Sequence, residues 1–146
     1  NLQSAKYLLR DYRGAILDLN KEIALGPKYY GQYSLRADCK LALRQYKDAI
    51  NDYSIAIEIA KKDQYSVLSF AFEERGYAKS QFKDYLGAIA DYTEAISYDP
   101  GNSQAYFYRG WAKLSLGKKD DGCLDLSKAG ELGYSEAYNY IRKYCN

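Results

Sequence analysis

One pattern of residue types occurs four times along the chain, and successive copies are displaced by 34, 39 and 34 residues. Each copy has a small residue, an aspartate three positions later, and a leucine or tyrosine directly after the aspartate. A period of this length is typical of repeat proteins, in which each unit buries its apolar face by stacking on its neighbours. The copies are Ala15, Asp18 and Leu19; Ala49, Asp52 and Tyr53; Ala88, Asp91 and Tyr92; and Gly122, Asp125 and Leu126.

Each repeat is predicted to contain two amphipathic helices. Within residues 103–116, Tyr106, Gly110, Lys113 and Leu114 are spaced i, i+4, i+7 and i+8, which places them on one face of a helix. Proline and glycine are expected to end the second helix of a repeat. The residues that do so here are Pro27 and Pro100, with Gly26, Gly101 and Gly133 nearby.

The one longer displacement indicates a five-residue insertion between the second and third copies, within residues 61–68. We expect this insertion to lengthen the helix that follows it. We also expect Gly122 and Gly130 to loosen the last repeat, because glycine lowers the stability of a helix.

The repeat resembles the tetratricopeptide repeat (TPR), a 34-residue unit of two helices, A and B. Helix A of that family carries an aromatic residue, then Gly or Ala, then a small residue, and helix B carries Ala, an aromatic residue, Ala and a closing Pro. The resemblance implies an all-α fold, a right-handed superhelical solenoid of stacked helix-turn-helix repeats with a C-terminal capping helix. The many tyrosines resemble those of bacterial members. The matching residues are Tyr33, Ala37 and Cys39; Phe72, Gly76 and Ala78; Tyr106, Gly110 and Ala112; Ala49, Tyr53 and Ala56; and Ala88, Tyr92, Ala95 and Pro100.

The resemblance divides the chain into one solenoid of residues 1–146. The first repeat begins partway into a helix A, so we expect upstream residues to be missing, and we expect the C-terminus to be genuine because a cap covers it. Ser135 is the expected N-cap of that last helix. One face of the cap is expected to contain Ala137, Tyr138, Ile141, Tyr144 and Cys145. The segments are a partial first repeat (1–28), a second (29–63), a third with the insertion (64–102), a fourth (103–134) and the cap (135–146).

Composition excludes several classes of function. The chain has no histidine, which removes histidine-dependent nucleophile activation, histidine zinc sites and the usual proton shuttle near neutral pH. The neighbouring carboxylates Glu73 and Glu74 point about 100° apart on a helix, so they do not form a catalytic pair. The chain also lacks a long apolar run that would span a membrane. We therefore expect no enzyme activity, no catalytic or metal-binding residues and no cofactor.

The three cysteines leave two alternatives open. Their odd number and the absence of a C-x-x-C spacing favour free, buried thiols. Cys123 and Cys145 lie in adjacent C-terminal segments, however, and a bridge between them would indicate an oxidising compartment. Cys39 belongs to neither segment.

Arginine and lysine recur four residues apart, as Arg36 and Lys40, Arg75 and Lys79, and Arg109 and Lys113, while Lys6 continues the lysine series. Both charges then lie on one face of a helix. We predict a ladder of partly exposed ion pairs with the repeated aspartates, between helices A and B or between neighbouring repeats, each worth about 0–1 kcal/mol. The alternative is a basic stripe for phosphate or RNA.

The resemblance also implies which residues face the concave groove formed by the A helices. Trp111, the only tryptophan, either contacts a partner there or packs against the adjoining helix or the cap. The acidic residues of this set favour an apolar or basic partner segment. The set is Ser34, Leu35, Asp38, Phe70, Glu73, Glu74, Tyr77, Gln104, Phe107, Tyr108 and Trp111.

Chaperone-binding members of the family hold a partner's C-terminal carboxylate with Lys, Asn and Arg. The same slots here hold Ser34, Asp38, Leu35, Phe70 and Glu74, so we predict that this chain does not bind such tails.

These observations predict a protein–protein interaction scaffold that binds a peptide or protein segment in the groove. The alternative is a solenoid that associates with itself. The small net charge of +2, spread along the chain, disfavours nucleic acid as a partner. The compartment stays open; the expectation is a soluble protein of the bacterial cytoplasm or periplasm.

Overall fold

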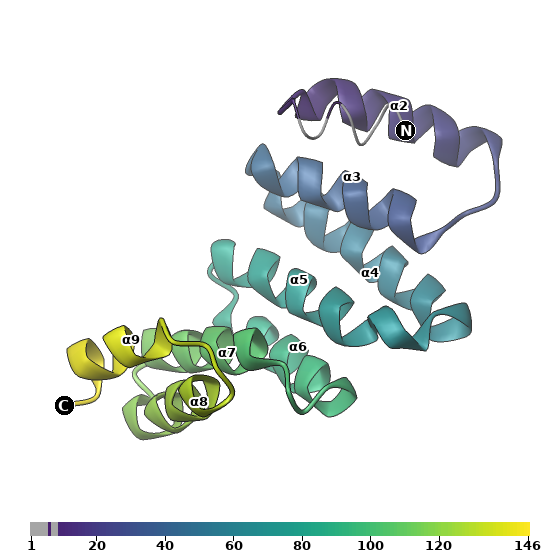
Figure 1. Ribbon diagram of the computed structural model, residues 1–146. Coiled ribbons are helices and arrows are strands. Elements are labelled where there is room, and N and C mark those ends of the chain that lie inside the picture. The colour runs from purple at the N-terminus through teal and green to yellow at the C-terminus, as the bar shows by residue number, and fades with distance from the viewer. Residues whose placement is uncertain (1–5, 7–8) are drawn as a thin grey trace. The chain divides into compact units, whose positions relative to one another are not determined.

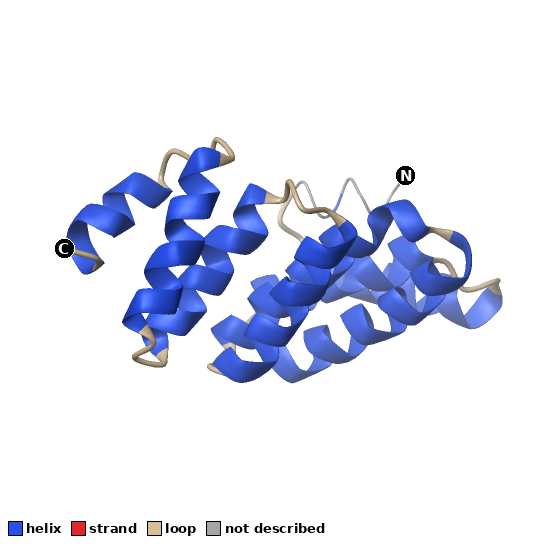
Figure 2. Ribbon diagram, turned by 90° about the horizontal axis from the view of Figure 1, so that it is seen from below, coloured by secondary structure: helices blue, strands red, loops and turns tan. Residues whose placement is uncertain are grey.

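The computed structural model describes Lys6 and residues 9–146, and all regular elements in that part of the chain are helices (Figures 1 and 2). The prediction of an all-α fold built from successive helix pairs, with a last helix after the fourth repeat, is confirmed. The helices are α2 (Tyr12–Leu25), α3 (Tyr30–Ala42), α4 (Tyr46–Asp63), the 3-10 turn η1 (Tyr65–Val67), α5 (Leu68–Gln81), α6 (Tyr85–Tyr98), α7 (Ser103–Ser115), α8 (Lys119–Glu131) and α9 (Ala137–Tyr144).

The chain divides into two compact units, residues 1–71 and 72–146, with the boundary inside α5. In the first unit α3 packs against both α2 and α4, and in the second unit α7 packs against both α6 and α8. The last helix, α9, packs against α8 (Figure 1). Consecutive helices therefore pack on one another from α2 to α4 in the first unit and from α6 to α9 in the second.

Short polar side chains start three of the helices. Asp11, Asp84 and Asn102 each accept a hydrogen bond from the backbone N–H three residues later, at 3.0, 2.9 and 2.9 Å. These bonds satisfy a backbone donor that has no partner inside the helix. The predicted N-cap Ser135 is wrong, because α9 begins at Ala137 after Glu136 and has no side-chain cap.

Small residues hold the paired helices close together. A Cβ on Gly110 of α7 would lie 2.8 Å from the carbonyl oxygen of Gly122 in α8, and a Cβ on Gly122 would lie 2.9 Å from that of Gly110. A Cβ on Gly130 would meet the ring of Tyr138 at 2.8 Å. The expectation that Gly122 and Gly130 loosen this repeat is therefore wrong, since both permit contacts that a larger residue would block.

The inserted residues extend the preceding helix, not the following one. α4 has 18 residues, whereas the equivalent helices α6 and α8 have 14 and 13. α5 has 14 residues and its equivalents α3 and α7 have 13 each. Because residues 61–63 continue α4 and η1 then makes the turn, the predicted lengthening of the following helix is wrong.

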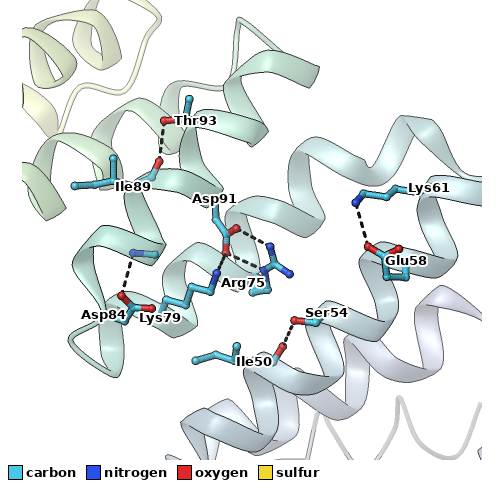
Figure 3. A network of polar contacts seen from close by, with 11 residues as sticks. Ile50, Ser54, Glu58, Lys61, Arg75, Lys79, Asp84, Ile89, Asp91 and Thr93 are labelled. Atoms are coloured by element: carbon cyan, nitrogen blue, oxygen red, sulfur yellow. Dashed lines mark hydrogen bonds and ion pairs between the residues drawn. The ribbon is translucent and has the colours of Figure 1, made fainter.

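The repeated aspartates are the acceptors of the predicted ion-pair ladder. In the second unit, Arg75 donates from Nε and Nη2 to the two carboxylate oxygens of Asp91 at 2.9 and 2.7 Å, and Lys79 Nζ lies 2.9 Å from Oδ2 (Figure 3). Arg109 and Lys113 hold Asp125 in the same way, at 2.7–2.8 Å.

The first unit repeats this arrangement. Arg36 and Lys40 bind Asp52 at 2.7–2.8 Å, and Lys6 binds Asp18 at 2.6 Å. The ladder within each repeat is confirmed, which leaves these cations committed to carboxylates inside the fold.

The prediction that these pairs are partly exposed is wrong for three of the carboxylates. The side chains of Asp52, Asp91 and Asp125 are only 1%, 4% and 8% exposed. Each of the three arginines also lies over the aromatic ring three residues before it, at 5.3–5.4 Å from the ring centre. Removing one partner of a buried carboxylate destabilises the fold far more than breaking a surface ion pair does, because water cannot solvate the charge that remains.

We expect Arg109→Gln to lower the free energy of unfolding by about 2–3 kcal/mol, since Asp125 would keep only Lys113 as a charged partner. Urea denaturation measures this change. The matched control is Arg142→Gln on the exposed face of α9, which should change stability by less than about 0.5 kcal/mol. Equal effects of the two substitutions would contradict the role assigned to the buried pair.

Candidate functional site: an aromatic cavity in the second unit

A cavity of about 390 Å³ opens between α5, α7 and α9 in the second unit. Its walls combine aromatic rings with hydroxyl, amide and ammonium groups. We call it the main cavity. The lining residues are Tyr77, Ser80, Gln81, Lys83, Tyr85, Phe107, Tyr108, Trp111 and Tyr140.

A second cavity of about 250 Å³ adjoins the first, because Trp111 and Tyr140 line both. Its other lining residues are Asn139, Lys143 and Tyr144, all on α9. We call it the cap cavity. The indole and phenol rings shared by the two cavities lie 5.4 Å apart in an edge-to-face arrangement.

The walls are stiffened by a continuous run of ring contacts. Tyr108 stacks on Tyr92 at 6.0 Å and meets Phe107 edge-on at 5.3 Å. Phe107 in turn meets Tyr140 at 4.9 Å, and Tyr140 meets Trp111. Aromatic pairs in these geometries add about 0.5–1.5 kcal/mol each beyond the area they bury. The cavity is therefore held open by side chains that pack on one another.

Burial changes the acidity of this wall. Desolvation raises the pKa of the Tyr108 hydroxyl to about 12 and raises that of Tyr92 further. Both hydroxyls keep their protons at neutral pH, so they remain hydrogen-bond donors.

The sequence left open whether Trp111 faces a partner or packs against the adjoining helix or the cap, and its position in the structure is compatible with both. Its ring packs against Tyr140 and Tyr144 of the cap, at 5.4 and 5.6 Å, and it also lines both cavities. Tyr77, at the equivalent position of the preceding repeat, is 37% exposed and meets Tyr108 edge-on at 5.4 Å.

The structure brings together four of the predicted groove residues, Tyr77, Phe107, Tyr108 and Trp111, around the main cavity. Phe107 is only 5% exposed, so its ring belongs to the core as well as to the wall. Gln104 is exposed and its side chain is hydrogen-bonded to Tyr134. The remaining predicted residues lie elsewhere: Ser34 is buried, Leu35 is half-buried and Phe70 is 53% exposed, all in the first unit.

Two of the three acidic residues of the predicted set, Asp38 and Glu73, are hydrogen-bonded inside the fold. Asp38 accepts a hydrogen bond from the hydroxyl of buried Tyr53 at 2.6 Å. Glu73 accepts one from Asn102 at 2.7 Å, and burial raises the pKa of Glu73. Glu74 is half-buried on α5. None of these carboxylates lines the main cavity or the cap cavity.

No metal-binding group emerges from the part of the chain that the structure describes, where no three His, Cys, Asp or Glu residues cluster. The same residues include no helix that is long and apolar enough to cross a membrane.

Tyr140 was missed by sequence reasoning, which placed Tyr138 on the buried face of the cap. Tyr140 is half-buried against Trp111, whereas Tyr138 is 46% exposed. Tyr140 lies three residues after the fully buried Ala137, a spacing that would have indicated it.

A disulfide joins Cys123 of α8 to Cys145 at the end of α9, with Cα atoms 5.8 Å apart. Of the two alternatives for the cysteines, the bridge is confirmed. Cys39 is a free, buried thiol whose pKa burial raises to about 11. The bridge fixes the helix that carries Tyr140 and Tyr144.

A family model described as tetratricopeptide repeat matches residues 91–123. The TPR protein YrrB has a similar structure, with a TM-score of 0.84 over 97% of this chain and 71% of that chain, at 16% identity. The family-model match over residues 91–123 and the shared fold support assignment to the tetratricopeptide repeat family. The TPR fold is also shared with MamA, at a TM-score of 0.82 over 94% of this chain and 77% of that chain, with 22% identity.

Another TPR structure, the first TPR of Spaghetti (RPAP3) bound to the HSP90 peptide SRMEEVD, has a TM-score of 0.72 over 80% of this chain and 90% of that chain, at 23% identity. Curated relatives include the STIP1 homolog of Dictyostelium discoideum, 35% identical over 49% of this chain, and dynein axonemal assembly factor 4 of Rattus norvegicus, 32% identical over 66%. The chain spans only 13% and 24% of the length of these two relatives.

Removing the disulfide should destabilise the last helix, α9. The bond closes a loop with a sequence separation of 22 residues, so Cys123→Ala with Cys145→Ala should cost about 3 kcal/mol in the chain-entropy account. Urea denaturation followed by the fluorescence of Trp111, which packs on α9, measures the loss. A dithiol reductant should weaken the unaltered chain and leave the double variant unchanged. Equal stability of the oxidised chain and the variant would contradict this prediction.

Glu73 predicts a pH dependence. Because burial raises its pKa in the folded state, the folded chain holds a proton that the unfolded chain releases, so stability falls as pH rises from about 4.5 through the folded pKa. Glu73→Gln keeps an acceptor for Asn102 and removes the charge. At pH 7.5 it should raise the free energy of unfolding by on the order of 0.5 kcal/mol and the melting temperature with it, whereas at pH 4 it should have little effect. Exposed Glu94→Gln is the control and should show no such pH-dependent gain. A melting temperature that Glu73→Gln leaves unchanged at pH 7.5 would contradict the assignment.

Proposed function

We propose that this chain is a non-enzymatic interaction scaffold that binds a segment of a partner protein, and that the main cavity takes an apolar or aromatic side chain of that segment. The observation that carries the proposal is the cavity itself. Its volume of about 390 Å³ lies within the range of ligand sites, about 300–1,000 Å³, and its walls are aromatic with a few polar groups.

The character of the walls supports a peptide as the ligand. Tyr77 and Trp111 are anchored by other rings and still line the cavity, which is typical of the residues that dominate binding energy at protein interfaces. Little conformational entropy is lost when such prepacked side chains meet a partner.

Structural neighbours support the same class of ligand. The Spaghetti TPR domain was captured with a peptide, and YrrB is described as a TPR protein with an unusual peptide-binding site. The predicted groove residues Leu35 and Phe70 lie in the first unit and remain a separate part of the proposal. Because the family's carboxylate-binding slots hold Ser34, Leu35 and Asp38 here, the proposal does not include recognition of a partner's C-terminal carboxylate.

The disulfide bears on the compartment in which the proposed scaffold would work. Bridges such as Cys123–Cys145 persist in oxidising surroundings and are rare where thiols are kept reduced. The disulfide therefore favours an oxidising compartment for the proposed scaffold.

Self-association is the second candidate function. It is supported by two leucines of α2, Leu17 and Leu25, whose side chains are 62% and 89% exposed. Sedimentation of the chain over a hundredfold concentration range tests this candidate. A constant monomer mass would exclude it.

The test of the scaffold uses peptides selected by the full chain from a displayed library of random dodecapeptides. Their affinity, measured by fluorescence anisotropy, should fall at least about tenfold for Tyr77→Ala with Trp111→Ala, since both anchors of the cavity wall are lost. The control is Tyr29→Ala with Tyr65→Ala, which removes two exposed tyrosines of the first unit. Trp111→Phe should retain most of the affinity because it keeps a ring against Tyr140.

Circular dichroism and urea denaturation establish that each variant is folded before binding is compared. If the folded double variant binds the selected peptides as well as the unaltered chain does, the cavity is not the binding site.

A further inference from the structure

The linings of the main cavity and the cap cavity are rich in hydrogen-bond donors. They contain tyrosine hydroxyls, the indole N–H of Trp111, the amides of Gln81 and Asn139, and two ammonium groups, Lys83 and Lys143. Neither lining contains a carboxylate. The indole and the two ammonium groups can only donate, so a ligand that complements them supplies acceptors, and a negative charge would be favoured.

These two lysines differ from the lysines of the ladder. Lys40, Lys79 and Lys113 each lie 2.7–2.9 Å from a buried aspartate. Across the described residues, neither Lys83 nor Lys143 lies within 4.0 Å of a carboxylate oxygen. Their charges remain available to a partner.

The backbone fixes the position of Lys83 at the edge of the main cavity. Its φ of 62° is left-handed, and the turn is closed by its N–H donating to the carbonyl of Ser80 and that of Asp84 donating to Lys79, both at 2.9 Å. A residue other than glycine in this conformation costs about 1 kcal/mol, and Gly117 holds the same position in the next repeat.

The acid nearest in sequence does not neutralise Lys83. The carboxylate of Asp84 accepts the backbone N–H of Gly87 at 2.9 Å and starts α6. At the cap cavity, Lys143 Nζ lies 5.0 Å from the ring centre of Tyr144, so it contacts the cavity wall and not an acid. One unneutralised cation thus stands at each cavity, with Trp111 and Tyr140 between them.

We propose that the two cavities together bind one internal segment of a partner protein, with an apolar or aromatic side chain against Trp111 and Tyr140 and acidic residues on both sides that pair with Lys83 and Lys143. This inference rests on the proposed function and adds the charge of the partner. The sequence favoured an apolar or basic partner segment because of acidic groove residues. Two of these, Asp38 and Glu73, are hydrogen-bonded inside the fold and do not line either cavity.

A protein segment fits better than a nucleic acid. Residues 72–146 contain 10 basic and 11 acidic residues, so the unit has no concentrated positive field. Nucleic-acid binding depends on many phosphate contacts and requires such a field.

The test uses the full 146-residue chain and the displayed dodecapeptide library. Each random segment is fused at its C-terminal end to the display protein, so no selected peptide can bind through a terminal carboxylate. Peptides selected by the unaltered chain should contain Asp or Glu beside an apolar residue about threefold more often than the input pool. Lys83→Glu with Lys143→Glu should abolish this enrichment. The control, Lys118→Glu with Lys119→Glu, reverses two exposed charges that line neither cavity and should leave it unchanged.

Synthetic versions of the selected peptides with blocked ends provide a second readout. Replacing their acidic residues by Gln or Asn should weaken binding to the unaltered chain about tenfold, and the loss should shrink as salt is raised. An affinity that the replacement does not change would overturn the proposal.

The other outcomes separate this inference from the proposed function. Selection of apolar peptides without acidic enrichment, or with Lys and Arg enrichment, would overturn the charge assignment and leave the cavity as a binding site. Failure to select any peptide would contradict both. Displacement of the selected peptides by single-stranded poly-uridylate at physiological salt would overturn the assignment in favour of nucleic acid.

Discussion

The rest of the structure depends on one interaction, the ion pairing of a buried aspartate on the second helix of a repeat with an arginine and a lysine on the first. Asp52, Asp91 and Asp125 each receive two donors from an arginine and one from a lysine. A bidentate arginine has one productive geometry, so the pair fixes the register of the helices as well as neutralising the carboxylate. Arginine and lysine in the repeated frame are thereby committed to the scaffold and do not form a surface for phosphate.

Residues 36–40, 75–79 and 109–113 share a frame that begins with Arg and ends with Lys, has a small residue at its second and fourth positions, and varies most at its third position. That position holds Asp38, Tyr77 and Trp111 in successive repeats. The two aromatic residues line the main cavity, while the glycines before them, Gly76 and Gly110, touch the facing helix. The repeated residues position the helices that line the main cavity, and the residues at the third position of the frame determine the chemistry of its lining. The cap completes it, because Tyr140 comes from the helix that the disulfide fixes.

The sequence was sufficient for features that repeat, since several copies of a spacing test one another. The helix pairs and the partners of the arginines were predicted in this way. Features that occur once were not: the insertion extended α4, and the Tyr140 contact depended on the rotation of a single short helix. The depth of the aspartates was missed because spacing places a residue on a face without saying what covers that face. The disulfide stayed one of two alternatives, since pairing requires Cα atoms within about 7 Å and the sequence contains no distances.

The central claim is that Arg, Lys and the small residues of the frame serve folding, whereas Tyr77 and Trp111 serve binding. A substitution scan of residues 75–79 and 109–113 tests it most directly. Every variant would be scored twice, for folding by protease resistance and for binding to a selected peptide. The account predicts that Arg, Lys and the small residues tolerate few substitutions in the folding score, whereas Tyr77 tolerates most of them and Trp111 many. It also predicts that these two positions lose binding among variants that remain folded. Folding losses at Tyr77 as severe as those at Arg75, or full binding by folded variants of Tyr77 and Trp111, would contradict it.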